Sequence, residues 1–206
     1  MREMDRIIEK ANGQRPRLLL HSCCGPCSSS CLELLVKYFD VSILWYNPNI
    51  YPVEEYNKRF ATLVELVEKM ELTDSVQILT EPYKSDVYYE AVKGLENEPE
   101  GGARCAKCFR LRLMETAKIA KQYGFDYFCS SLTLSRHKDA VLINSLGEDI
   151  GKVVGIQWLP SEFKKRNGEN RSIELCEKFN LYRQLYCGCE FSLRNREEHE
   201  KQNPED

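Results

Sequence analysis

No segment of the sequence is apolar enough, over enough residues, to cross a membrane. The first residues, MREMDRIIEKANGQRPR, are charged throughout and lack the apolar core of a secretory signal. Elsewhere no run approaches the ~18 apolar residues of a transmembrane helix. These absences predict a cytoplasmic protein, and in that reducing compartment clustered cysteines are more often metal ligands or catalytic thiols than structural disulfides.

The sequence also lacks a large net charge, internal repeats and low-complexity tracts. A formal net charge of -3 provides no overall positive field for nucleic acid, so any polyanion has to meet local basic patches. With 206 residues, 42% of them hydrophobic, the chain can bury one substantial core, and we expect one domain over residues 1–206. The candidate patches are Arg104, Lys107, Arg110 and Arg112; Arg136, His137 and Lys138; and Lys164, Lys165, Arg166 and Arg171.

What the sequence does contain is cysteine in three compact groups. Two C-x-x-C pairs can supply four soft sulfur ligands, the number that zinc or a [4Fe–4S] cluster requires. The first group also contains two adjacent cysteines, which fit a cluster with several irons better than a single zinc ion. The groups are Cys23, Cys24 and Cys27 in HSCCGPC, Cys105 and Cys108 in RCAKC, and Cys187 and Cys189 in YCGCE.

Other uses of the first two groups stay open. Residues 24–27 read CGPC, the active-site sequence of thioredoxin-like thiol–disulfide oxidoreductases, but Ser22 and Cys23 stand where those proteins usually have Trp. A thioredoxin-like function also leaves the later cysteine groups unexplained. A zinc-stapled binding module is the third class that the pattern allows.

Of the remaining cysteines, two form a candidate redox-active pair and three stand alone in the sequence. Gly188 between Cys187 and Cys189 permits the tight backbone of a small strained disulfide, and strained disulfides are the labile, catalytic kind. Alternatively, the two thiols have no shared role or serve as additional metal ligands. Three further cysteines fall in predicted helices or strands and are expected to pack as small hydrophobes. They are Cys31, Cys129 and Cys176.

Alternating apolar patterns predict an α/β fold. Short apolar runs typical of buried strands alternate with segments of helical period, which indicates a mostly parallel sheet with helices on both faces, resembling the nucleotide-binding (HUP or Rossmann-like) α/β folds, plus a C-terminal helical extension. We predict strands at 17–21, 41–46, 75–80, 125–132 and 153–159. We predict helices at 1–11, 26–38, 54–70, 85–94, 106–123, 138–151, 172–179 and 191–202, with 96–104 as a loop that leads to Cys105.

The predicted strands place several polar segments at one edge of the sheet. Ligands of parallel sheets collect at the carboxyl ends of the strands. Cys23 and Cys24, residues 45–49 and residues 130–135 all follow predicted strands directly. The first cysteine group also stands where related folds keep a phosphate loop, so helix N-terminal amides there would stabilise negative thiolates or sulfides.

With these residues in view, the chain resembles the cobalamin-independent epoxyqueuosine reductases, which complete queuosine synthesis on tRNA. The matching segments follow the family's order over nearly the whole chain. They are LLLHSCCGPCS at 18–28, YNPNIYPVEEYNKR at 46–59, RCAKCFRLRL at 104–113, FCSSLTLSRHKD at 128–139 and FKKRNGENRSIELCEKFNLYRQLYCGCEFS at 163–192.

The resemblance implies an enzyme that removes the epoxide oxygen of epoxyqueuosine in the tRNA anticodon, with electrons from an unidentified donor. It implies that Cys187 and Cys189 form a redox-active, catalytic pair. A second iron beside the cluster is also implied as an option, bound by one of Cys23, Cys187 or Cys189. The implied [4Fe–4S] ligands are Cys23, Cys24, Cys105 and Cys108.

Substrate binding on this hypothesis combines two kinds of contact. The basic patches would meet phosphates, and an exposed aromatic residue would stack on an anticodon base, as proteins commonly read RNA loops. Core packing is the alternative role for each aromatic. The candidate aromatics are Trp45, Tyr46 and Tyr51, and the candidate proton donors are His137, Asp139 and Tyr186.

Overall fold

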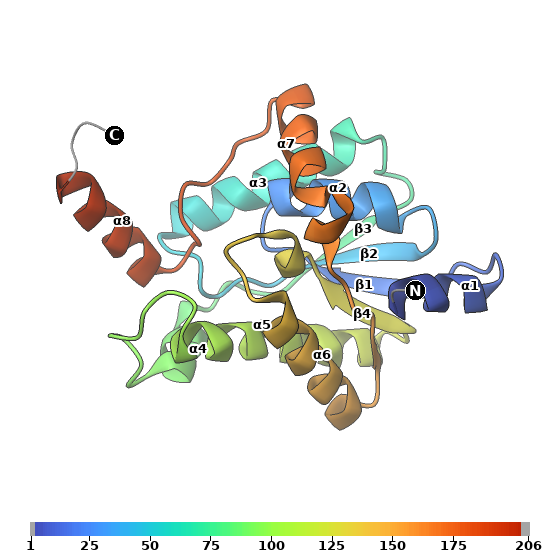
Figure 1. Cartoon of the computed structure of the whole chain (residues 1–206), viewed down its shortest axis with the longest axis horizontal. Coiled ribbons are helices and arrows are strands. Elements are labelled where there is room, and N and C mark those ends of the chain that lie inside the picture. The colour runs from blue at the N-terminus through green and yellow to red at the C-terminus, as the bar shows by residue number, and fades with distance from the viewer. Residues whose placement is uncertain (1–2, 203–206) are drawn as a thin grey trace.

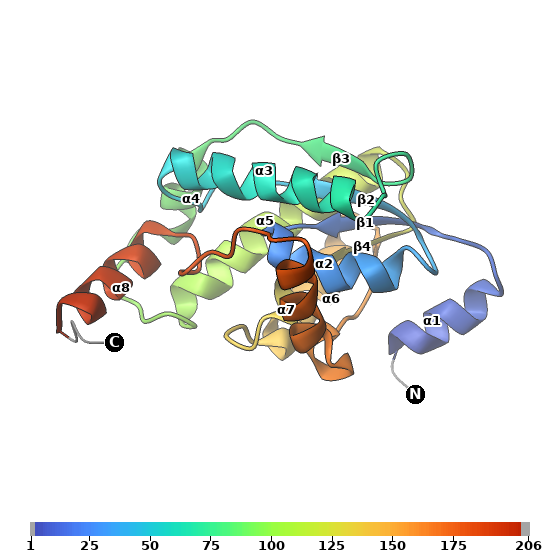
Figure 2. The same cartoon turned by 90° about the horizontal axis from the view of Figure 1, so that it is seen from above.

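The computed structural model describes residues 3–202 and contains one five-stranded parallel sheet between two groups of helices (Figures 1 and 2). The strand order is β3-β2-β1-β4-β5, and every neighbouring pair is parallel. The order reverses beside β1, which is the topology of Rossmann-like folds. The strands are β1 (Arg17–His21), β2 (Asp40–Trp45), β3 (Gln77–Thr80), β4 (Tyr127–Ser130) and β5 (Gln157–Trp158).

The helices cover both faces of the sheet, as predicted. One face is covered by α2, α3 and α7, and the other by α4, α5 and α6, while α8 projects away at one end (Figure 1). The helices are α1 (Glu3–Ala11), α2 (Gly25–Leu35), α3 (Val53–Lys69), α4 (Ser85–Val92), α5 (Ala103–Gln122), α6 (Ala140–Val154), α7 (Gly168–Lys178) and α8 (Glu190–Gln202). Within residues 3–202, no helix has both the length and the apolar character that crossing a membrane requires.

The central strands are buried on both faces, which explains their continuous apolar runs. Leu18, Leu19 and Leu20 of β1 are fully buried, and so are Ile43 and Leu44 of β2. A strand covered by helices on both sides has no solvent-facing side chains, so its sequence does not alternate between polar and apolar residues. This pattern is why both strands could be predicted within a residue of their ends.

Two predicted boundaries were wrong in ways that affect the site. Helix α5 begins at Ala103 after the N-cap residue Gly102, so Cys105 lies inside the first turn of the helix and not in the preceding loop. Strand β5 has two residues instead of seven, because α6 continues to Val154 and ends at Gly155 in the left-handed conformation (φ 78°).

The carboxyl ends of three strands are joined by hydrogen bonds. Ser22, just after β1, donates its backbone N–H to the Leu44 carbonyl at 3.0 Å and accepts from the Asn47 amide at 2.8 Å. After β4 the chain turns into a 3-10 helix, η1 (Ser131–Leu134), and Ser131 Oγ accepts from the backbone N–H of Cys23 at 3.3 Å. The first cysteine group is therefore fixed at the edge where the topology predicts a ligand site.

Candidate active site

The first cysteine group forms the N-terminus of α2. Cys24 is the N-cap residue, and its Sγ accepts hydrogen bonds from the Cys27 backbone N–H at 3.3 Å and from Gln184 Nε2 at 3.0 Å. The ligand atoms of Cys23, Cys24 and Cys27 all lie within 4.8 Å of one another. A Cβ on Gly25 would lie 2.9 Å from Thr62, so the loop can pack against α3 only with glycine at this position.

Hydrogen bonding within the group favours a negative charge on one sulfur. Hydrogen bonds from Cys24 and Cys27 hold the pKa of Cys23 well below its usual range, although burial opposes them. Burial raises the pKa of Cys24, and hydrogen bonds with Cys23 and Cys24 raise the pKa of Cys27. The three thiols therefore favour a thiolate at Cys23, supported by two neutral donors.

A buried histidine lies beneath this group at the end of β1. His21 Nδ1 lies 2.9 Å from Ser130 Oγ, and Nε2 lies 3.2 Å from the Tyr46 carbonyl. Burial lowers the pKa of His21 to about 4, so the imidazole is neutral at pH 7. His21 therefore ties β1 to the ends of β2 and β4 and adds no positive charge beside Cys23.

The loop that carries Cys187 and Cys189 is held by α3. Arg59, which is buried, donates from Nη1 to the Cys187 carbonyl and from Nη2 to the Tyr186 carbonyl, each at 3.2 Å, and Glu55 pairs with its Nε at 2.7 Å. Gly188 has φ 125°, and a Cβ there would lie 2.9 Å from Arg59 Nη1. Glycine is thus required between the two cysteines for both space and backbone conformation.

The two cysteines of this loop have different surroundings. Lys138 Nζ donates to Cys187 Sγ at 2.9 Å, and the Lys138 side chain is only 11% exposed. Cys189 is buried and packs with Cys108 and Tyr88, and burial raises its pKa. All ten cysteines are free thiols in the structure, so the predicted disulfide between Cys187 and Cys189 stays a prediction.

Helix α5 supplies the second cysteine pair and a buried cation. Cys105 Sγ accepts from the Gly101 backbone N–H at 3.2 Å, while burial raises the pKa of Cys108 to about 12 against the opposing charge of Arg112. Arg112 is 2% exposed and, within residues 3–202, has no carboxylate within 4.0 Å. Its Nη2 is buried without a hydrogen-bond partner. Burial opposes its charge, and negative charge on Cys108, Cys187 and Cys23 would stabilise its guanidinium.

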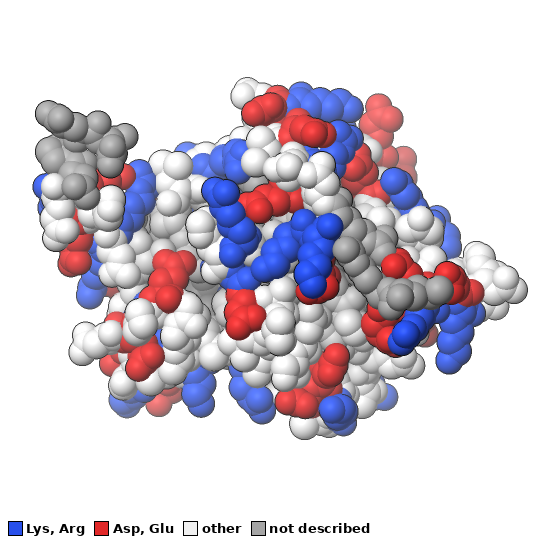
Figure 3. All heavy atoms as spheres, viewed as in Figure 1, with Lys and Arg blue, Asp and Glu red and all other residues white. Residues whose placement is uncertain are grey.

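One cleft of about 680 Å³ exposes thiols from two of the three groups. Its wall contains Cys23, Cys27 and Cys187 together with Arg112 and Lys138. Lys and Arg side chains gather on this face over the loop that leads into α6, with acidic side chains at their border (Figure 3). The cleft therefore combines sulfur nucleophiles, buried cations and a basic entrance, and this volume is within the range of small-molecule sites.

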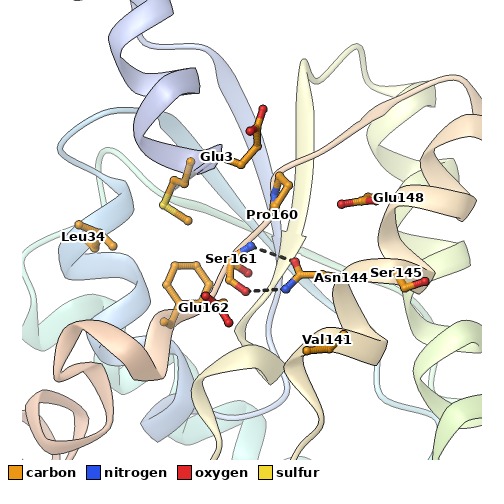
Figure 4. Close-up of a pocket in the computed structure, with 11 residues that line it drawn as sticks. Glu3, Leu34, Val141, Asn144, Ser145, Glu148, Pro160, Ser161 and Glu162 are labelled. Carbon is orange, nitrogen blue, oxygen red and sulfur yellow. Dashed lines mark hydrogen bonds between the residues drawn. The ribbon is translucent and has the colours of Figure 1, made fainter. Parts of the chain in front are cut away.

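A second cavity of about 410 Å³ has a different character (Figure 4). It lies beside α1 and α6, where Asn144 exchanges two hydrogen bonds with the Ser161 backbone, at 2.8 and 3.0 Å. Its wall is formed by apolar side chains such as Met4 and Phe163 together with three glutamates, and it contains no thiol. The candidate chemistry therefore belongs to the thiol cleft.

The structure groups the predicted ligands differently from the sequence pairing. Cys23 and Cys24 lie together, and Cys27, which the predicted ligand set omits, lies with them. Cys108 packs beside Cys189, which belongs to the predicted redox pair. Cys105 lies on α5 one turn before Cys108. The three cysteines expected in the core are buried there. They are Cys31, Cys129 and Cys176.

Several predicted substrate contacts have other roles. Trp45 is 1% exposed and packs against Tyr56 and Phe60, so it has the alternative role, core packing, and is not a candidate for stacking on RNA. Tyr51 is exposed but lies outside the cleft wall. Asp139 caps α6 by accepting two backbone N–H groups, whereas both other proposed proton donors line the cleft. These are His137 and Tyr186.

The basic patches are also divided by the structure. Arg104 is buried and donates to the carbonyls of residues 96 and 98, so it braces the loop before α5. The patch at 136–138 lines the cleft. The side chain of Arg166 lies outside the described part of the chain. Sequence reasoning missed Arg59 and Gln184, because their contacts join segments far apart in the chain. It also missed Arg183, an exposed residue in the wall of the cleft.

Comparisons with known proteins identify similar sequences. The family described as Epoxyqueuosine reductase QueH matches residues 18–195. Proteins named Epoxyqueuosine reductase QueH from Streptococcus pyogenes serotype M1 and Staphylococcus epidermidis are each 43% identical, covering 94% and 91% of this chain and 76% and 83% of theirs. The protein of that name from Thermotoga maritima is 33% identical, covering 88% of this chain and 92% of its own.

A search of solved structures finds the NMN synthetase from Francisella tularensis, with a TM-score of 0.43 and 14% sequence identity. The match covers 97% of this chain and 93% of that chain.

Proposed function

Because this chain belongs to the epoxyqueuosine reductase QueH family, we propose that it reduces the epoxide of epoxyqueuosine at the wobble position of tRNA to queuosine. The observation that carries the proposal is the cleft in which Cys23, Cys27 and Cys187 meet Arg112 and Lys138. An enzyme that removes oxygen from an epoxide needs electrons, protons and a binding surface for a polyanionic substrate. Thiols and cations in one cleft provide residues for each of these tasks.

Four of the thiols are proposed as ligands of a [4Fe–4S] cluster. The donor set fits the group, because an iron–sulfur centre bound by thiolates is an anion and Arg112 is a buried cation with an orphaned Nη2. The hydrogen bonds that Cys24 and Cys105 accept are also suited to thiolates. When bound, the cluster supplies electrons one at a time. The proposed ligands are Cys23, Cys24, Cys105 and Cys108.

Cys187 and Cys189 are proposed as the store of two electrons. One epoxide and two thiols give one alkene, one water and one disulfide, so the dithiol balances the reaction in electrons and protons. Cys187 is the thiol that lines the cleft, and Lys138 holds its Sγ by the 2.9 Å hydrogen bond. Buried Cys189 then closes the disulfide, which an external donor must reduce before the next turnover.

A second iron is the competing use of these residues. One of Cys23, Cys187 or Cys189 would then bind an additional iron. If that ligand is Cys187 or Cys189, the two thiols are not a free redox pair. Counting iron and sulfide per chain separates the two arrangements. A thioredoxin-like function is disfavoured by the position of Cys24, because burial raises the pKa of the thiol that such an enzyme needs ionised.

The test is anaerobic purification followed by single-turnover reduction of tRNA that contains epoxyqueuosine, with queuosine measured by mass spectrometry. We expect brown protein with broad absorption near ~400 nm, typical of iron–sulfur centres. Cys108→Ala should lose iron and colour, whereas Cys189→Ala should keep the iron and lose turnover. Cys176→Ala, which removes a thiol from the core, is the matched control and should keep both.

The wild-type protein could also be colourless and contain zinc. That result would contradict the iron–sulfur assignment. Retained turnover in Cys189→Ala would contradict the redox pair alone, and retained iron in Cys108→Ala would move the fourth ligand to Cys27.

A further inference from the structure

The segment 181–188 crosses the mouth of the cleft between α7 and α8 without helix or strand structure. The side chains of Tyr182, Gln184 and Tyr186 are each hydrogen-bonded to another segment of the protein. These anchors fix the backbone of the segment before any substrate binds. The hydrogen bonds are from Tyr182 Oη to Glu55, from Gln184 Nε2 to Cys24 Sγ, and from Tyr186 Oη to the Tyr51 carbonyl.

Among the residues of this segment that line the cleft, Arg183, Leu185 and Cys187 stand at alternate positions. Arg183 is exposed and, within residues 3–202, has no carboxylate within 4.0 Å. Leu185 is 68% exposed although it is a large apolar residue, and Cys187 follows at the wall. Alternate residues of extended backbone lie roughly 6.6 Å apart. A cation, an apolar side chain and a thiol therefore follow one another along the entrance.

The surrounding charges distinguish Arg183 from its neighbours. Arg136 and Arg196 also line the cleft, but Glu169 lies 3.4 Å from Arg136, and Glu200 lies 2.7 Å from Arg196. Arg183 is thus the entrance arginine with a guanidinium open to an external anion. Phosphates of RNA are the anions that such exposed cations bind, and apolar side chains beside them cover the faces of unstacked bases.

Resting on the function proposed above, we propose that residues 183–187 form a strap that reads the single-stranded anticodon loop. Arg183 binds a backbone phosphate next to the modified nucleotide. Leu185 packs against the face of a neighbouring base. The modified base thereby enters the cleft with its epoxide toward the thiols, and the anchors of the even-numbered residues keep the strap in register.

Binding of an unmodified anticodon stem-loop RNA, measured by fluorescence anisotropy, tests the strap separately from catalysis. A phosphate contact on single-stranded RNA contributes about 0.7 to the slope of log affinity against log salt. Arg183→Gln should therefore flatten the slope by about 0.7. Leu185→Ser should weaken binding about fivefold at every salt concentration, with the slope unchanged, because only an apolar base contact is lost.

Two variants near the C-terminal end of α6, at residues that do not line the cleft, provide matched controls. Lys152→Gln removes a charge from an exposed side chain, and Val153→Ser removes an apolar side chain that is 74% exposed. Both should bind RNA like the wild-type protein. All four changes lie on the surface, and circular dichroism checks that each variant is folded.

The outcomes separate the strap from the function. If the wild-type protein binds the RNA and reduces epoxyqueuosine while Arg183→Gln and Leu185→Ser match their controls, the strap is wrong and the function stands. If the strap variants show the expected losses but no preparation reduces epoxyqueuosine, RNA reading by the strap stands and the proposed reaction fails. If the wild-type protein does not bind the RNA, the strap is wrong, and the turnover experiment alone decides the function.

Discussion

Two cations, Arg112 and Lys138, determine the electrostatics of individual thiols. A buried guanidinium or ammonium group without a nearby carboxylate is costly. The Lys138 ammonium lies 2.9 Å from Cys187 Sγ and 4.0 Å from Glu100, so the sulfur is its nearer partner. The Arg112 charge interacts with Cys108, Cys187 and Cys23 in the same way. These residues are placed to stabilise negative sulfur.

Lys138→Met removes the cation at Cys187 while keeping an unbranched side chain that is only one atom shorter. A hydrogen bond to a charged group contributes ~1.5–3 kcal/mol, so we expect kcat for tRNA reduction to fall about 10- to 100-fold. Iron content should not change. The measurement is single-turnover kinetics, with Lys118→Met, at an exposed lysine paired with Glu115, as the control. An unchanged kcat would show that the contact with Cys187 has no catalytic role.

Helix α7 connects two parts of the site at the level of secondary structure. Arg171 donates to both carboxylate oxygens of Glu33 on α2, at 2.9 and 2.6 Å, and Ser172 Oγ donates to the Pro26 carbonyl at 2.6 Å. These contacts hold α7 against the first turn of α2, which contains Cys27. After α7 ends at Lys178, the chain continues to the strap at residues 183–187. The position of α7 therefore affects both the first turn of α2 and the strap.

The ion pair between α2 and α7 predicts a pH-dependent contribution to stability. Hydrogen bonds from Arg171 hold the pKa of Glu33 below its usual value. The pKa of Glu33 is thus lower in the folded state than in the unfolded state. The ion pair therefore contributes its full stabilisation above the unfolded-state pKa, and this contribution is lost as the pH falls through the folded-state pKa. The side chains of Arg171 and Glu33 are 42% and 33% exposed, so solvent screens their interaction. Arg171→Gln should therefore lower the free energy of unfolding by at most about 1 kcal/mol at pH 7.

Urea unfolding of wild-type protein and Arg171→Gln measures this contribution. The difference between them should shrink as the pH falls through the lowered folded-state pKa of Glu33, below which the carboxylate is protonated in both states. Lys93→Gln, which breaks a pair with both side chains more than 70% exposed, should show no such trend. A difference that stays constant with pH would mean that Arg171 stabilises the helix contact through packing alone.

At the scale of the whole molecule, the thiols come from three chain regions on different elements. The first group begins α2, the second lies on α5, and the third precedes α8. The core around β1, β2 and β4 consists mainly of other apolar side chains. A centre bound by ligands from separate regions stabilises the folded state without binding the unfolded chain.

Removal of iron by chelation should therefore loosen the site and spare the sheet. Hydrogen exchange measured by mass spectrometry should increase at residues 22–28, 99–109 and 181–190, while β1 and β2 keep their protection. The melting temperature should fall at the same time. Equal exchange in the iron-containing and chelated protein would contradict metal binding by these regions.

The sequence by itself was sufficient for most of the fold. Buried apolar runs predicted the parallel strands at 17–21 and 41–46, and helical periods predicted the helices that cover the sheet, because each pattern is repeated within a short segment. The spacing of cysteines identified the three thiol groups for the same reason. Boundaries that depend on caps, such as the start of α5 at Ala103, were less accurate, because glycine leaves the choice between loop and helix open.

Only the tertiary structure decided how these groups are combined. It packed Cys108 with Cys189, set Lys138 against Cys187, and buried Trp45, which was a candidate for stacking on RNA. It also arranged the strap, in which alternate residues are anchored or open. Such roles depend on contacts between residues far apart in the chain, and a distance in space leaves no periodic pattern in the sequence. Local patterns therefore determined the elements and the thiols, and packing determined what each thiol faces.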